Sequence, residues 1–153
     1  MLVHVSRAVS ITLGAIPEED VRALLVQPWN MVASDGGYPG GDPGEGHPRS
    51  AGTFPRVLGL YVRVLGLLSL EEAVRKITQL PASNLGLRDR GRLADGMAAD
   101  IVVFDPATVT DRSTWEDPHQ FSEGVVHVLV NGELALQAGE LTGETPGRWL
   151  RRQ

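Results

Sequence analysis

The sequence predicts an α/β protein, in which strands and helices alternate over the first 90 residues and strands predominate afterwards. Apolar residues recur at helical spacing before residue 90, and β-branched residues form short runs after residue 100. The chain has 153 residues, of which 42% are hydrophobic, and this is enough to bury a core. We therefore expect two regions, residues 1–90 and residues 91–153.

The first region begins with a predicted strand at residues 9–13 and a helix at residues 17–28. Pro17 suits the first helical turn, and the acidic residues that follow it favour the positive end of the helix dipole. Residues 29–33 form a compact apolar run that predicts a buried strand. Residues 36–55 contain seven glycines and four prolines, which predict a long loop.

Three helical stretches follow this loop. Residues 55–67 place apolar side chains on one helical face. Ser69 begins the next helix, and Glu72 three residues later completes a capping box. Pro81 begins a last helical turn, which we expect to end near Gly86.

The second region contains predicted strands at residues 100–104, 125–130 and 134–137. Asn131 and Gly132 separate the last two strands, and this dipeptide is a strong signal for a tight hairpin. We therefore expect an antiparallel pair here.

The composition excludes several classes of protein. A net charge of -5 leaves no basic stripe for nucleic acid. The longest apolar stretch, residues 57–70, is interrupted by Arg63 and is shorter than the ~20 residues that cross a membrane, so no membrane partner is expected. Ser10 and Thr12 interrupt the apolar stretch near the N-terminus, which disfavours a secretion signal and leaves a cytoplasmic location as the expectation.

The potential metal ligands are few and scattered. There is no cysteine, so no thiolate zinc site is possible. The four histidines show neither a His-x-His pair nor a helical i, i+4 pair: they are His4, His47, His119 and His127. We therefore expect no complete metal site from this chain alone.

Two residues are candidates for chemistry. Asp35 follows the apolar run at the start of a glycine turn, and the carboxyl ends of strands are where α/β active sites collect. Such a carboxylate can take a proton from water and return it to a leaving group. Arg49 can bind a substrate carboxylate through two hydrogen bonds. From the residues alone, a turn aspartate and a solvated loop arginine are the simpler interpretations.

The chain resembles the D-aminoacylases, the N-acyl-D-amino-acid deacylases of the metal-dependent amidohydrolase superfamily, and specifically their C-terminal part. The resemblance extends from about Val9 to Arg148 and is most particular in the stretch Gly-Thr-Phe-Pro-Arg-Val-Leu-Gly at residues 52–59. The other matching stretches are residues 18–21, 27–29, 34–36, 47–49, 70–73, 91–93, 96–105 and 128–132.

The resemblance implies a fold and a role for each candidate. It implies the C-terminal portion of a (β/α)8 barrel in residues 1–90, followed by part of a small β-sandwich in residues 91–153. Residues 29–34 would be the last barrel strand. Asp35 would match the aspartate that activates a zinc-bound water, and Arg49 would match the arginine that binds the α-carboxylate of the N-acyl-D-amino acid.

The chain also departs from the family pattern. A complete barrel needs about 250 residues, and the metal-binding histidines of the family have no counterpart here. We expect zinc in the parent enzyme, none in this chain alone, and no deacylase activity of the isolated chain. The partner would be a missing N-terminal portion. Two alternatives remain: a non-catalytic unit that self-associates, and a remnant in which Arg49 still binds a carboxylate.

Overall fold

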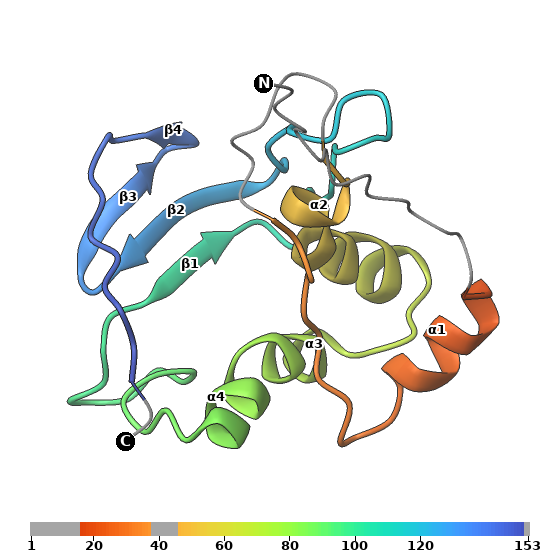
Figure 1. The fold of residues 1–153 in the computed structure, drawn as a ribbon, viewed down its shortest axis with the longest axis horizontal. Coiled ribbons are helices and arrows are strands. Elements are labelled where there is room, and N and C mark those ends of the chain that lie inside the picture. The colour runs from red at the N-terminus through yellow and green to blue at the C-terminus, as the bar shows by residue number, and fades with distance from the viewer. Residues whose placement is uncertain (1–15, 38–45, 152–153) are drawn as a thin grey trace, which may run out of the picture.

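The helices lie together on one side of the molecule, and a small sheet lies on the other (Figure 1). The computed structural model describes residues 16–37 and 46–151. Within these described ranges, five helices precede four strands. The strands after residue 100 agree with the predicted strand-rich second region, but the described part of residues 1–90 contains helices without the strands predicted to alternate with them.

The helices are short and their bounds are close to several of the predicted ones. They are α1 (Glu18–Leu25), α2 (Arg49–Arg56), the π-helix η1 (Val57–Val64), α3 (Leu70–Ile77) and α4 (Gln79–Leu85). None of the helices in the described ranges is long and apolar enough to cross a membrane.

The signals at Ser69 and Gly86 are confirmed, whereas the helix predicted to begin at Pro81 already begins at Gln79. The Ser69 hydroxyl accepts a hydrogen bond from the N–H of Glu72 at 3.2 Å, as expected for an N-cap. Gly86 ends α4 with a φ of 76°, a left-handed conformation that glycine adopts without steric cost. Both signals act within a few residues, so they need no tertiary contact to operate.

The predicted loop at residues 36–55 was too long, because α2 already begins at Arg49. The N-cap of this helix is Pro48, and the Nδ1 atom of His47 accepts the N–H of Arg49, the first residue of α2, at 3.0 Å. Pro55, which predicted a helix start, lies inside α2 instead. Its missing N–H disrupts the regular bonding pattern, and the wider π-helix η1 follows directly.

The sheet is antiparallel, with the strand order β1-β2-β3-β4. Its strands are β1 (Ile101–Phe104), β2 (Val125–Val130), β3 (Glu133–Gln137) and β4 (Glu140–Leu141), of which β4 was not predicted. Asn131 and Gly132 connect β2 to β3 with φ angles of 51° and 88°, which confirms the predicted hairpin.

The strand predicted at residues 29–33 was wrong for the described structure. Residues 30–37 have no assigned secondary structure, although the N–H of Val32 bonds to the carbonyl of Lys76 at 3.2 Å. A buried strand needs neighbouring strands to satisfy its backbone, and the described residues place none beside this segment. The strand predicted at residues 9–13 lies outside the described residues.

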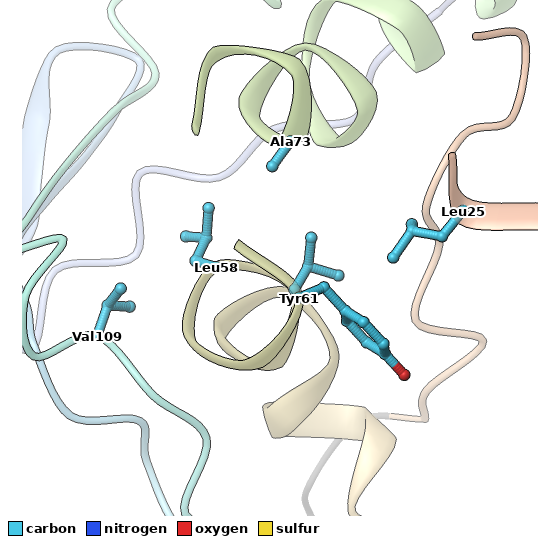
Figure 2. Close-up of a cluster of buried hydrophobic side chains, with 6 residues drawn as sticks. Leu25, Leu58, Tyr61, Ala73 and Val109 are labelled. Carbon is cyan, nitrogen blue, oxygen red and sulfur yellow. The ribbon is translucent and has the colours of Figure 1, made fainter. Parts of the chain in front are cut away.

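The hydrophobic core lies between the helices and the loop after β1 (Figure 2). Its buried members are Leu25, Val57, Leu58, Tyr61, Ala73 and Val109. Gly59 permits this packing, because a Cβ there would lie 2.7 Å from the carbonyl oxygen of Val109. The core therefore fixes α3 and the α2–η1 helix relative to each other.

Candidate active site

Asp35 lies in the segment that follows α1 and directly precedes Gly36 and Gly37. Its φ of 46° is left-handed, which is uncommon for a residue other than glycine. The hydroxyl of the neighbouring Ser34 accepts the N–H of Gly36 at 3.2 Å and closes a tight turn around Asp35. The Asp35 side chain is 86% exposed, so its carboxylate is accessible to solvent and to a ligand.

A close backbone contact brings this turn to the start of α2. A Cβ at Gly36 would lie 2.6 Å from the Cα of Ser50, so only glycine fits without displacement. Ser50 directly follows Arg49 in the first turn of α2. The Gly36 contact therefore places Asp35 beside Arg49, although the two residues are separated by a glycine-rich stretch.

Asp35 and Arg49 form an ion pair. The Nη2 atom of Arg49 lies 2.9 Å from the Oδ2 atom of Asp35, and the Arg49 side chain is 43% exposed. An exposed pair of this kind adds little stability, typically less than about 1 kcal/mol. The structure thus brings together the two residues that the sequence singled out separately.

His47 and Trp115 extend this site, and the sequence did not assign a role to either. The His47 ring meets the Trp115 ring edge-on with centroids 4.6 Å apart. Burial lowers the pKa of His47 from 6.5, the positive charge of Arg49 lowers it further, and Asp35 opposes both effects. The neutral ring is therefore favoured, and its Nδ1 atom can accept the N–H of Arg49. No spacing in the sequence links Trp115 to this turn.

The arrangement can bind an acid and move a proton. The guanidinium of Arg49 presents a planar fork of donors that matches a carboxylate. The carboxylate of Asp35 can accept a proton and return it to a nearby group. Both groups lie at one exposed position, so a ligand can reach them together.

The described residues do not form a metal site. Within residues 16–37 and 46–151, no three His, Asp or Glu side chains are grouped closely enough to hold an ion. Two of the histidines already use one ring nitrogen for the fold. The Nδ1 atom of His47 accepts the Arg49 N–H, and that of His127 accepts the Ala138 N–H at 3.1 Å. These residues do not fit the requirements of a bound metal.

An apolar cavity of about 430 Å³ lies elsewhere, between the helices and β1. Its lining includes Phe54, Leu58, Ile77, Val102, Phe104 and Val125. Asp35, His47 and Arg49 do not line it. The cavity is therefore separate from the candidate site.

A carboxylate from the segment after α1, paired with a guanidinium at the start of α2, is consistent with part of a hydrolase of the amidohydrolase type. Comparison of the sequence with known families supports this class, because residues 5–135 match the amidohydrolase family. The chain belongs to this family.

Individual relatives and solved structures agree with the family match. The chain is 51% identical over 138 residues to an N-acyl-D-glutamate deacylase of Alcaligenes xylosoxydans xylosoxydans, a match that covers 90% of this chain. A D-aminoacylase variant in complex with CuCl2 superposes with a TM-score of 0.83 at 45% identity over 90% of this chain. N-acyl-D-glutamate deacylase from Bordetella bronchiseptica, complexed with zinc and a phosphonate inhibitor, has a TM-score of 0.73 at 44% identity over 82% of this chain.

The match covers only part of each relative. It spans 28% of the Alcaligenes deacylase, 28% of the D-aminoacylase variant and 27% of the Bordetella deacylase. The chain therefore corresponds to little more than a quarter of a full-length relative.

Proposed function

We propose that this chain is the C-terminal part of a zinc-dependent amidohydrolase that hydrolyses N-acyl-D-amino acids to a D-amino acid and a carboxylic acid. The ion pair between Asp35 and Arg49 carries this proposal, because it joins a proton-transfer group to a carboxylate-binding group. The deacylases among the relatives support the same substrate class. Residues 1–90 would contribute the last β/α units of the barrel, and residues 91–153 a share of the β-sandwich.

Arg49 would bind the α-carboxylate of the substrate. In the free chain its guanidinium contacts the Asp35 carboxylate, and a substrate carboxylate would take the place of this carboxylate on the guanidinium. Binding would thereby release Asp35 from its cationic partner. Arg49 thus orients the substrate and leaves the aspartate free to act as a base.

Asp35 would transfer the proton during hydrolysis. Hydrolysis adds the oxygen of water to the acyl carbon and breaks the bond from that carbon to nitrogen. The proton that Asp35 takes from the water goes to the departing amine, which leaves as the free D-amino acid. The described residues offer no ligand set for zinc, so zinc would be held by the rest of the parent enzyme.

A chimeric enzyme tests this proposal. This chain would replace the corresponding quarter of the Alcaligenes N-acyl-D-glutamate deacylase, which is 51% identical over the matched residues. We expect zinc-dependent hydrolysis of N-acetyl-D-glutamate by the chimera and none by the isolated chain. In the chimera, Asp35→Asn should lower kcat by about 10²–10⁴-fold, whereas Arg49→Met should mainly raise KM.

A matched control separates these effects from general damage to α2. Arg56 pairs with Asp111 at 3.2 Å at the other end of α2 and is half exposed, so Arg56→Met should leave both kinetic constants unchanged. An Asp35→Asn chimera that keeps full activity would overturn the proposed role of Asp35. Hydrolysis by the isolated chain would overturn its dependence on a missing portion.

A further inference from the structure

In residues 16–37 and 46–151, the segment that carries Asp35 is held by groups other than a sheet. Residues 30–37 have no assigned strand, and among the described residues Val32 makes one backbone bond to another element, to Lys76. A chain segment with few backbone bonds samples many conformations unless other groups hold it. Side chains from neighbouring elements therefore have to fix the path of this segment toward Asp35.

Lys76 near the end of α3 provides the first anchor. Its side chain is completely buried, which is rare for an ammonium group. The Nζ atom donates to the carbonyl oxygens of Gln27 and Asn30, the latter at 3.1 Å, and lies 3.6 Å from a carboxylate oxygen of Glu72. Three donors thus face three acceptors, which compensates for burial of the charge.

Arg75 provides a second anchor on the same turn. Its Nη2 atom donates to the carbonyl of Pro28 at 2.7 Å. The guanidinium also makes two hydrogen bonds to Glu72, at 2.8 and 2.9 Å, which hold it in this orientation. Two neighbouring residues of α3 therefore bind three carbonyl groups of the turn at residues 27–30.

The α3 helix is itself fixed, so these anchors are rigid. Ala73 is fully buried in the core (Figure 2), and Ser69 caps the helix. Beyond the anchored turn, Val32 bonds to the carbonyl of Lys76, and Gly36 packs on the start of α2. Asp35 lies between these two contacts, and its backbone is held on both sides.

We propose that Lys76 and Arg75 are positioning residues for Asp35: they act through the turn at residues 27–30 to hold the Asp35 carboxylate beside Arg49. Neither residue acts on the substrate. This inference rests on the proposed function, because the position of Asp35 matters only if Asp35 takes part in the reaction.

Nuclear magnetic resonance of the full 153-residue chain tests the proposal without an activity measurement. The variants are Lys76→Met, which keeps the aliphatic part of the buried side chain, and Arg75→Met. The Arg75 side chain is one third exposed, so its replacement perturbs the core less. In both we expect amide exchange of Val32 to accelerate at least about tenfold relative to that of Ala73. The nuclear Overhauser contacts between Asp35 and Arg49 should also disappear.

The controls distinguish positioning from general stabilisation. Arg75→Lys keeps a donor for the Pro28 carbonyl, so the slow amide exchange of Val32 and the nuclear Overhauser contacts between Asp35 and Arg49 should both be retained. Arg63→Met removes a comparable contact from η1 to the carbonyls of Pro106 and Val109 and should leave both signals unchanged.

Two results would overturn the proposal: parallel acceleration of Val32 and Ala73 exchange, or retained contacts between Asp35 and Arg49 in the Arg75→Met variant. If Lys76→Met does not fold, the Arg75 variants decide the outcome. An inactive chimera would overturn the proposed function. It would not affect this test, because the amide exchange rates and nuclear Overhauser contacts are measured on the 153-residue chain itself.

Discussion

The left-handed backbone of Asp35 makes a quantitative prediction about which residues this position tolerates. Its φ of 46° raises the conformational free energy of a residue with an ordinary Cβ by about 1 kcal/mol. This penalty is absent for glycine and smaller for asparagine than for most residues. The ion pair adds less than about 1 kcal/mol, because the Asp35 side chain is 86% exposed. The two contributions are separable by substitution.

We expect Asp35→Asn and Asp35→Gly to keep the free energy of unfolding within about 1 kcal/mol of the wild-type value. Asp35→Ala should be about 1 kcal/mol less stable than Asp35→Gly, because only alanine meets the steric cost of the left-handed region. With a urea m-value of about 2 kcal/mol/M, this difference lowers the urea midpoint by about 0.5 M.

Urea denaturation followed by far-ultraviolet circular dichroism measures these differences. Ala107 provides the control, because it is exposed and is not among the described residues with a positive φ. Ala107→Gly should therefore be destabilising by about 0.4–1 kcal/mol, so that alanine is the better residue there. An Asp35→Ala chain as stable as Asp35→Gly would show that Asp35 is not held in the left-handed conformation.

Three further predictions concern charge and packing. The hydrogen bonds from Arg75 lower the pKa of Glu72 from 4.5 to about 2, so its stabilising contribution is present above pH 4.5 and is lost as the pH falls toward 2. Glu72→Gln should flatten the pH dependence of the urea midpoint in this range, and an unchanged slope would contradict this assignment. In a proton magnetic resonance titration, Arg49→Met should raise the pKa of His47, whereas Asp35→Asn should lower it; shifts of the opposite sign would refute the described contacts. Val109 is 1% exposed, and Val109→Ala should lower the free energy of unfolding by about 2–3 kcal/mol; a loss below about 0.5 kcal/mol would show that it is not in the core.

Features that depend on a few neighbouring residues could be predicted from the sequence. Ser69 and Glu72 specify a helix start, because a side chain meets a backbone group three residues away. Gly86 specifies a helix end, and Asn131 with Gly132 specifies a hairpin, because these positions need left-handed angles. Each signal is complete within its own segment.

Features that depend on distant groups could not be predicted in the same way. The apolar run at residues 29–33 predicts a buried strand, but a strand forms only where an adjacent strand pairs with it. The start of α2 was missed because its N-cap is Pro48, which makes no side-chain cap bond and is not among the usual capping residues. The burial of Lys76 could not be predicted either, because its acceptors are backbone carbonyls of the turn at residues 27–30, which is distant in the sequence.

For this protein, the sequence by itself determined the strand-rich second region, several local caps and turns, and the residue types suited to acid–base chemistry and carboxylate binding. The resemblance to the deacylases likewise depended on residues alone. Only the tertiary structure decided that Asp35 contacts Arg49 at 2.9 Å and that α3 holds the segment leading to Asp35. The physical reason is that a cap or a turn is a local interaction, whereas a site assembled from separate segments depends on how the core fixes their helices in space.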